Sequence, residues 1–243
     1  MENALLIGMT RQMALRREMS IIANNLANIN TNGYKSEHPL FEEYLMPTAT
    51  EESGDKDISF VQDVGMHRNL GPGRIDVTEN PLDVAISGEG YFKVQTPEGV
   101  RYTRNGAFEL NAQGQLVTPD GHPVLTAGGA PITFGTDETG IIIASDGTIS
   151  TSQGERGQLG LVKFENERQL QNAGGTLYRT EQAELPVEEA RLMQGAIESS
   201  NVQPILEMTN MISVMQAYQS ANNIVDKSDE LQRRAISTLA ETN

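Results

Sequence analysis

The sequence predicts an α+β protein in which a long helix at each end of the chain flanks a central antiparallel all-β domain. Residues 3–29 contain no proline and a single glycine, and the 39 residues after Pro204 contain neither, so both stretches can continue as helix. Between them, short β-prone runs alternate with dipeptides such as Asn105-Gly106 and Asp146-Gly147, mostly seven to eight residues apart. Such spacing is typical of a compact antiparallel β domain.

The apolar residues of the two expected helices recur at alternating spacings of three and four. This rhythm is expected where one helix packs along another, so we predict that the terminal helices form a coiled-coil-like domain. Asn32-Gly33 should end the first helix because both residues tolerate positive φ, and Pro204 suits the first turn of the second. The expected contact rows are Leu15, Met19, Ile22, Leu26 and Ile29 in the first helix and Val214, Ala217, Ala221, Ile224, Leu231 and Ala235 in the second.

These elements divide the chain into two domains joined by two connections. Residues 1–35 and 196–243 are predicted to form a helical assembly domain from the two ends of the chain. Residues 70–185 should form the central β domain. Residues 36–69 are expected to be a linker or extended segment, and residues 186–195 the return linker.

The composition excludes several classes of function. The formal net charge of −15 argues against nucleic acid as a partner, because phosphate binding depends on clustered lysine and arginine. Cysteine is absent, which excludes disulfides, thiolate catalysis and thiol metal sites. The N-terminus lacks the pattern of a secretory signal, and no apolar run approaches the ~20 residues needed to cross a bilayer, so we expect no direct membrane insertion.

No residue pattern indicates catalysis, a metal site or a cofactor. The three histidines lie far apart and belong to no spaced ligand motif. The Gly-x-Gly within Ser87–Tyr91 lacks the third glycine and the following helix of a phosphate loop, which favours a tight turn before a strand. We therefore predict that the protein is not an enzyme and holds neither metal nor cofactor.

Four aromatic residues in the middle of the chain admit two interpretations. Tyr91, Phe92, Tyr102 and Phe108 could form a platform that binds sugar rings. The favoured alternative is that they anchor the core of a domain in a chain with only six Phe, six Tyr and no Trp.

Asparagines cluster in residues 23–35, ANNLANINTNGYK, although asparagine is a mediocre helix former. On a helix, Asn24, Asn25 and Asn28 form a polar strip beside the apolar row, and residues 221–224, ANNI, offer a matching strip. Buried amides require partners with matching donors and acceptors, so pairing of the strips would fix the register of helix packing. The alternative is that these amides cap the helix and bond locally.

Three stretches resemble the flagellar basal-body rod and hook family, and they occur in the family's order. They are ANNLANINTNGYKSE near the N-terminus, SGEGYFKV followed by YTRNGAF in the middle, and SNVQPILEMTNMISVMQAYQSANNIVDKSDEL near the C-terminus. Within the family, the short length and the opening MENALLIGM favour the proximal rod type, with the distal rod type as the alternative. Residues 216–219 read QAYQ where the distal type usually carries Arg-Ala-Tyr-Glu, so an interface salt bridge of that type is not carried over.

The resemblance implies a structural subunit of the bacterial flagellar basal-body rod, in the part of the flagellum that spans the periplasm. Its terminal helices would polymerise as the inner layer of a tube that transmits torque, with the β domain outside them. Its partners would be copies of itself, proximal rod subunits below, distal rod subunits above, and the flagellar type III export apparatus, which would export the chain unfolded. Outside the family, the alternative is a secreted carbohydrate-binding or cell-wall-cleaving protein.

The expected assembly interface combines the helix rows, the asparagine strips and the methionines of the last helix. Methionine suits such a surface because its flexible side chain can pack against slightly different neighbours. The expected interface residues are Leu15, Met19, Ile22, Asn24, Asn25, Leu26, Asn28, Ile29, Met208, Ile212, Met215, Tyr218, Ala221, Asn222, Asn223, Ile224 and Leu231.

Overall fold

The computed structural model describes residues 2–46, 58–135, 138–187 and 191–241, which fold into two compact units. The first, called the helical unit below, combines Met1–Ala27, Glu37–Arg68 and Gln203–Asn243. The second, called the β unit, combines Asn28–Ser36 and Asn69–Val202. Each unit is therefore assembled from segments that lie far apart in the sequence.

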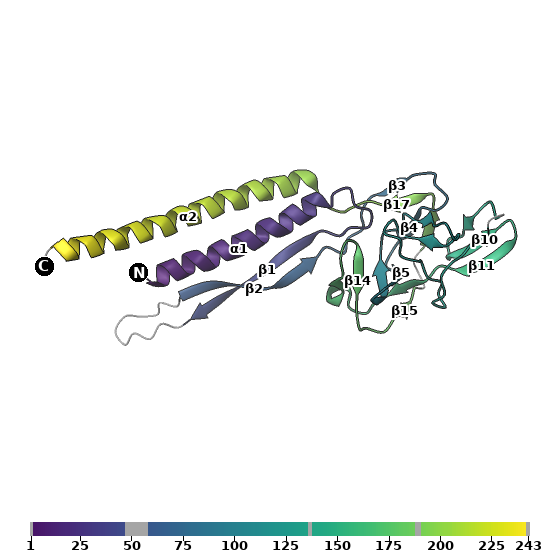
Figure 1. The fold of residues 1–243 in the computed structure, drawn as a ribbon, viewed down its shortest axis with the longest axis horizontal. Helices are drawn as coiled ribbons and strands as arrows, with labels where there is room; N and C mark the ends of the chain where they lie inside the picture. The colour runs from purple at the N-terminus through teal and green to yellow at the C-terminus, as the bar shows by residue number, and fades with distance from the viewer. Residues whose placement is uncertain (1, 47–57, 136–137, 188–190, 242–243) are drawn as a thin grey trace. The chain divides into compact units, whose positions relative to one another are not determined.

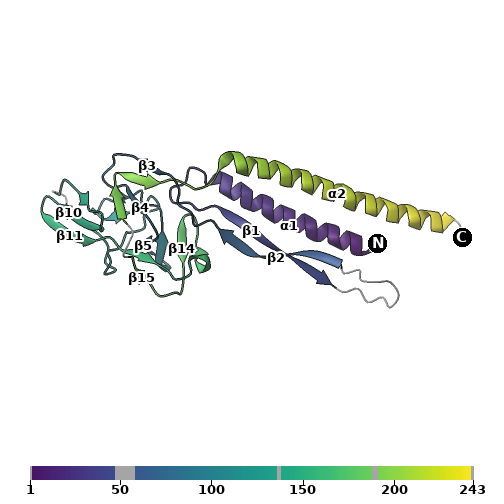
Figure 2. The same ribbon diagram turned by 180° about the vertical axis from the view of Figure 1, so that it is seen from behind.

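Two long helices dominate the helical unit (Figures 1 and 2). Helix α1 spans Glu2–Ala27 and helix α2 spans Pro204–Glu241, and they lie side by side with opposite chain directions. The prediction of a helix at each end of the chain, with a β domain between them, is confirmed. Proline opens α2 because the first helical N–H has no partner within the helix. Among the described residues, no helix combines the length and apolar character needed to cross a membrane.

The first helix ends earlier than the sequence predicts. After Ala27 the chain turns, and the backbone N–H of Thr31 donates to the carbonyl of Asn28 at 3.2 Å. Gly33, with φ of 69°, lies beyond this turn and does not itself end the helix. Ile29, expected in the helical contact row, therefore lies outside the helix.

A long hairpin completes the helical unit. Strand β1 (Glu37–Met46) pairs antiparallel with strand β2 (Ile58–Arg68), from Glu37 opposite Arg68 to Met46 opposite Ile58. Both strands contact α1, which lies between the hairpin and α2. Residues 37–46 and 58–68 of the predicted linker or extended segment are therefore paired strands and not a linker, while residues 47–57 lie outside the described residues. The runs LFEEYLM and ISFV are rich in aromatic and aliphatic residues, which favour a paired strand over a solvated linker.

The β unit is built from short strands, and every strand pair described in it is antiparallel. The strands are β3 (Ile75–Val77), β4 (Val84–Ser87), β5 (Tyr91–Thr96), β6 (Gly99–Thr103), β7 (Glu109–Leu110), β8 (Leu116–Val117), β9 (Ile142–Ile143), β10 (Thr148–Thr151), β11 (Gly154–Gln158), β12 (Leu161–Lys163), β13 (Gln171–Asn172), β14 (Leu177–Arg179), β15 (Leu185–Pro186), β16 (Arg191–Gln194) and β17 (Ala196–Glu198), with the 3-10 helix η1 at Glu167–Gln169. The largest sheet has the order β13-β14-β6-β5-β12-β15. The smaller sheets are β11-β10-β9, β16-β4, β17-β3 and β7-β8.

Two groups of buried side chains form the core of the β unit. In the larger group, the rings of Phe92 and Phe108 meet edge to face with centroids 5.1 Å apart, among aliphatic neighbours such as Ile149. The smaller group contains Tyr91 and Tyr102. All four aromatic residues that the sequence offers as a sugar platform are thus buried, at 6% exposure or less. They anchor the core, and the platform interpretation is wrong.

The segment that returns the chain to α2 belongs to the β unit. Strand β16 pairs with β4, and Leu192 packs into the larger core group between exposed Arg191 and Met193. Strand β17 then pairs with β3. In the described part of the predicted return linker, 186–187 and 191–195, the linker prediction is therefore wrong, as is the assignment of residues 196–202 to the helical domain; residues 188–190 lie outside the described residues. The reason is a period-two alternation of buried and exposed residues, which is too short to stand out in the sequence.

Candidate assembly surface

The two long helices approach each other closely at Gly8. A Cβ atom at this position would lie only 2.7 Å from Cγ2 of Val225, so a larger residue would push the helices apart. Elsewhere along the pair, Ile22 of α1 and both Val214 and Ala221 of α2 are buried. The helices therefore share an apolar centre within one chain.

The buried side of α2 follows the predicted contact row at Val214, Ala217 and Ala221 and departs from it at Ile224 and Leu231. Ile224 and Leu231, expected to face a helix partner, are 64% and 61% exposed. Val225, the residue after Ile224, is half-buried instead, and so is Ser228, which lies on the predicted row between Ile224 and Leu231. Ile224 and Leu231 are therefore not buried against α1, because the close contact at Gly8 turns Val225 toward α1, and their role in assembly stays a prediction.

A row of large apolar side chains on α2 is exposed. Ile205, Met208, Ile212 and Met215 follow one another at spacings of three, four and three, so they share one face of the helix. Their exposed fractions are 78%, 45%, 54% and 43%. These four residues are called the outer row below. A contiguous apolar row on a surface is typical of a site that binds another protein.

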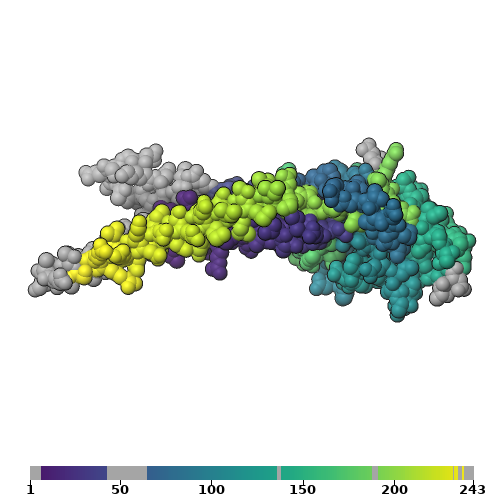
Figure 3. All heavy atoms as spheres, turned by 90° about the horizontal axis from the view of Figure 1, so that it is seen from above, coloured from purple at the N-terminus to yellow at the C-terminus, as the bar shows by residue number. Residues whose placement is uncertain are grey.

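The part of the helix pair around the outer row is almost free of charge. From Pro204 to Val225 the only charged side chain is that of Glu207, which is buried, and α1 carries no charge from Met19 to Ala27. The chain as a whole is 21% charged. Figure 3 shows α2, green to yellow, at the surface of the helical unit with α1 beside it in purple. Exposed helix faces usually carry charges, whereas the cores of interfaces lose them, so this uncharged face is a candidate contact with another subunit.

A groove of about 500 Å³ runs between α1 and α2. Four of its lining residues, Gly8, Ala217, Ser220 and Ala221, are small. We name it the helix groove, and its lining residues are Ile7, Gly8 and Arg11 of α1 and Ala217, Ser220, Ala221 and Ile224 of α2.

The asparagines of α1 bond within the chain. The side-chain amide of Asn25, fully buried, donates to the carbonyl of Glu37 at 2.8 Å and accepts from the backbone N–H of Glu37 at 3.0 Å. These two bonds attach α1 to the first residue of β1. The side-chain oxygen of Asn28 accepts from the hydroxyl of Thr31 at 3.1 Å, in the turn after the helix. A role of the asparagines in assembly stays a prediction.

The residues of the expected interface fall into three classes of burial. Ile22, Asn25 and Ala221 are buried in the helical unit. Those that are half-buried are Leu15, Met19, Leu26, Asn28, Ile29, Tyr218 and Asn222. Those that are exposed, and so available to another subunit, are Asn24, Met208, Ile212, Met215, Asn223, Ile224 and Leu231.

The β unit contains a buried ion cluster that no sequence pattern indicates. The carboxylate of Glu198 accepts from Nζ of Lys35 at 2.6 Å and from Nε of Arg104 at 2.8 Å, and it also accepts from the backbone N–H of Gly73. All three charged side chains are at least 94% buried. Because Lys35 and Glu198 are 163 residues apart, no local spacing could reveal the pair.

Burial and mutual attraction shift the pKa values in this cluster. Burial lowers the pKa of Lys35, the positive charge of Arg104 acts in the same direction, and Glu198 partly offsets both. For Glu198, burial alone would raise the pKa, but attraction to Arg104 and the hydrogen bond from Lys35 lower it below its ordinary value. The carboxylate is therefore held ionised between its two cationic partners.

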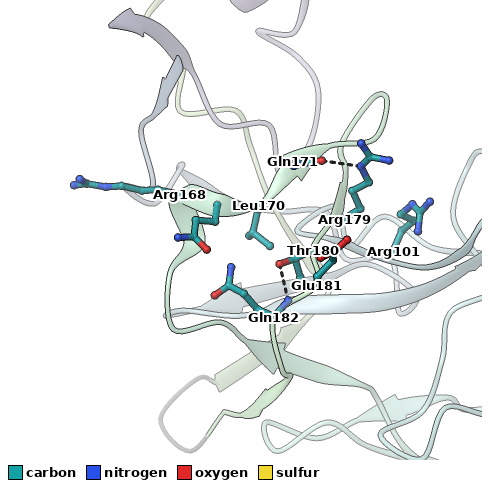
Figure 4. A pocket seen from close by; sticks show the side chains of 9 residues that line it. Arg101, Arg168, Leu170, Gln171, Arg179, Thr180, Glu181 and Gln182 are labelled. Carbon is teal, nitrogen blue, oxygen red and sulfur yellow. Dashed lines mark hydrogen bonds between the residues drawn. The ribbon is translucent and has the colours of Figure 1, made fainter. Parts of the chain in front are cut away.

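The β unit also has an open pocket of about 940 Å³ lined by Arg101, Arg168 and Arg179 (Figure 4). Their side chains do not converge, because Arg168 points away from the other two. Nε of Arg179 donates to Gln171 at 3.0 Å, and Arg101 pairs with Glu98. Within the described ranges, no three His, Cys, Asp or Glu residues are placed to hold a metal ion. The pocket thus has no focused set of groups that would bind a small anion.

Three family models match this chain. They are the flagella basal body rod protein over residues 5–35, the flagellar hook protein FlgE/F/G D1 domain over residues 85–151, and the flagellar basal body rod FlgEFG protein C-terminal region over residues 193–238. The first and third cover most of the described helices, and the second covers much of the β unit.

Curated relatives match along the whole length. The flagellar basal-body rod protein FlgF of Caulobacter vibrioides is 40% identical, with 100% of each chain covered. FlgF of Mesorhizobium japonicum is 34% identical over 98% of each chain, and the flagellar basal-body rod protein FlgG of Buchnera aphidicola subsp. Acyrthosiphon pisum is 35% identical over 94% of this chain and 96% of the relative. The chain therefore belongs to the flagellar basal-body rod protein family, as a structural subunit of the rod for which the FlgF type is favoured.

Proposed function

We propose that this rod subunit is of the FlgF type, lies in the proximal rod and polymerises through its terminal helices. The observation that carries the proposal is the uncharged face of α2 with its outer row. Large apolar side chains on that face stay in water unless another subunit covers them. The 40% identity with FlgF of Caulobacter vibrioides over the full length supports the type.

Within each subunit, we propose that α1 and α2 pack in the manner of a coiled coil. Residues of α2 that are buried or half-buried recur at alternating spacings of four and three, as in the contact row of a coiled coil. Small residues on both helices would allow the close approach already seen at Gly8. The row is Glu207, Met211, Val214, Tyr218, Ala221, Val225 and Ser228.

The paired helices would give the rod its stiffness. Helix α2 has 38 residues, which corresponds to about 57 Å at 1.5 Å per residue. Subunits that join head to tail through contacts that do not close build a helical tube. A layer of such helix pairs transmits torque because each pair is continuous along its length, and the β unit forms the outer part.

The proposal includes the neighbours and the route of delivery. In the rod, the partners are copies of this chain, proximal rod subunits below and distal rod subunits above. The flagellar type III export apparatus exports the chain unfolded. In a strain that makes the subunit but lacks the export apparatus, we expect no subunit to reach the rod.

The FlgG type is the second candidate, since FlgG of Buchnera aphidicola is also 35% identical to this chain. A deletion strain separates the two types. If the chain is of the FlgF type, the rod left in the deletion strain should be an incomplete proximal rod, whereas loss of an FlgG-type chain should leave the whole proximal rod and remove only the distal segment. The alternative of a sugar-binding protein loses its main support, because its candidate aromatic residues are buried.

Substitution in the outer row tests the polymerisation surface. We expect Ile212→Asp to abolish swimming of the deletion strain and incorporation into isolated basal bodies, because a carboxylate would be buried without a partner in the contact. The β unit should remain folded by circular dichroism. The control is Met13→Asp, which places the same charge at a 71% exposed methionine on a charged part of α1. Normal incorporation of Ile212→Asp, or equal loss with Met13→Asp, would contradict the proposal.

A further inference from the structure

The helix groove and the outer row lie on different sides of α2. At about 100° per residue, the groove residues Ala217 and Ile224 lie about 150° around the helix from the outer-row residues Met208 and Ile212. Ile212 and Ile224 are also separated by about 18 Å along the helix axis. The outer row therefore cannot fill the groove of its own chain, and one chain presents both surfaces.

We propose that the outer row of one copy docks into the helix groove of the next copy. This inference rests on the proposed function, because it names the partner of the same assembly surface. The groove provides about 500 Å³, and the outer row supplies two isoleucines and two methionines at helical spacing. The small side chains of Ala217 and Ala221, and the absence of a side chain at Gly8, leave the groove unfilled. Small residues at a helix contact bring the helix axes closer, so a neighbouring helix can enter this groove.

The distribution of charge fits a dry contact between these surfaces. Among the described residues that line the groove, Arg11 alone is charged, and it is exposed. Thr209, Ser213 and Gln216, which flank the outer row, are uncharged. Docking would therefore cover apolar side chains without the cost of burying an unpaired charge.

The geometry favours a repeating contact over a closed dimer. Docking of the outer row into the groove joins two different surfaces, so each added copy still presents a free groove or a free outer row. A contact of outer row with outer row would instead stop at two copies and leave every groove open. A second copy of this chain is therefore the occupant that uses both surfaces.

Disulfide cross-linking tests the inference directly, because the natural chain contains no cysteine. Two differently tagged forms, one with Ile212→Cys and one with Ile224→Cys, are produced together in the deletion strain, and isolated basal bodies are oxidised. A disulfide needs Cα atoms within about 7 Å, so these positions can be linked only between two copies. We expect a dimer that carries both tags. A chain with both substitutions should give a ladder of larger species.

The controls separate this inference from the proposed function. Met13→Cys in place of Ile224→Cys keeps an exposed cysteine on the helix pair but outside the groove, and should give no dimer. The pair Met208→Cys and Ser220→Cys is a second, independent test. Dimers of the Ile212→Cys form with itself, or no mixed dimer from either pair in basal bodies that contain both forms, would overturn the inference and leave the proposed function standing. Absence of the unmodified chain from basal bodies would overturn both.

Discussion

Glu198 is the residue on which three distant segments of the β unit converge. Its two carboxylate oxygens bind Lys35, Arg104 and the backbone N–H of Gly73. Nη2 and Nη1 of Arg104 each donate one hydrogen bond to a carbonyl, of Gly88 at 3.0 Å and of Gly90 at 3.1 Å. Buried charges are tolerated only when paired and hydrogen-bonded in this way, so each partner depends on the others.

Replacement of Glu198 by Gln should strongly destabilise the β unit. The substitution leaves Lys35 and Arg104 buried without a counter-charge, and breaking a buried pair in this manner costs about 3–5 kcal/mol. Thermal unfolding followed by circular dichroism measures the loss. The matched control is Glu98→Gln, which removes an exposed partner of Arg101 and should change the stability little. Equal shifts in the two variants would show that the ion cluster is not a main source of stability.

The same variant tests how the ionised carboxylate of Glu198 contributes to the stability of the β unit at different pH. Because the pKa of Glu198 is lowered in the folded protein, its charge stabilises folding above the unfolded value of 4.5, and this contribution is lost as the pH falls through the lower folded value. The difference in stability between the natural chain and Glu198→Gln should therefore be full near pH 7 and shrink in acid. A difference that stays constant down to pH 3 would contradict the assignment.

At the scale of elements, the side-chain amide of Asn25 joins α1 to β1 through two hydrogen bonds with the backbone of Glu37. Asn25→Leu should improve the intrinsic helix propensity of α1 and still destabilise the helical unit, because the N–H and C=O of Glu37 lose their partner and each unsatisfied group costs about 1–3 kcal/mol. Hydrogen exchange should become faster in residues 37–42. Asn24→Leu, at the exposed neighbouring position, is the control and should leave that exchange unchanged. Slow exchange in the Asn25 variant would show that the hairpin is held by other contacts.

The elements that the sequence could predict are those whose pattern is local. The two long helices follow from the absence of proline and from apolar spacing, and Pro204 correctly marks the start of α2. The hairpin and strand β16 were missed because their packing partners lie elsewhere in the chain, as Leu192 illustrates. The exposure of Ile224 and Leu231 could not be predicted, because it depends on the contact between Gly8 and Val225.

The candidate site was predictable only in part for the same reason. Periodicity selected Met208, Ile212 and Met215, which are exposed as an interface requires. It also selected Asn25, whose amide is used inside the chain. A signal that was available in the sequence is the lack of charge from Pro204 to Val225, broken only by Glu207. The ion pair between Lys35 and Glu198 has no such signal in the sequence, because the two residues meet only in the folded β unit.

At the scale of the whole molecule, each unit contains segments from near the N-terminus and from later in the chain. The β unit includes Asn28–Ser36, which reaches it from the end of α1. In this segment, the N–H of Gly33 donates to the carbonyl of Glu198 at 2.7 Å, and the N–H of Ser36 donates to the side chain of Asn201 at 2.8 Å. Nine residues near the N-terminus therefore complete a unit whose strands begin about forty residues later.

A pair of fragments tests whether this short segment is required for the β unit. A fragment of residues 28–202 retains Lys35 and its hydrogen bonds, and we expect it to unfold cooperatively. A fragment of residues 69–202 leaves Glu198 with Arg104 as its only charged partner in the described cluster and loses the bonds of Gly33 and Ser36. If the lost pair costs about 3 kcal/mol, its melting temperature should fall by roughly 6–12 °C in calorimetry. Lys35→Met in the longer fragment should reproduce most of that fall, because it removes the same ammonium and keeps the backbone bonds. Equal melting temperatures for the two fragments would show instead that residues 28–36 only connect α1 to the hairpin, and that the ion cluster stabilises the β unit through Arg104 alone.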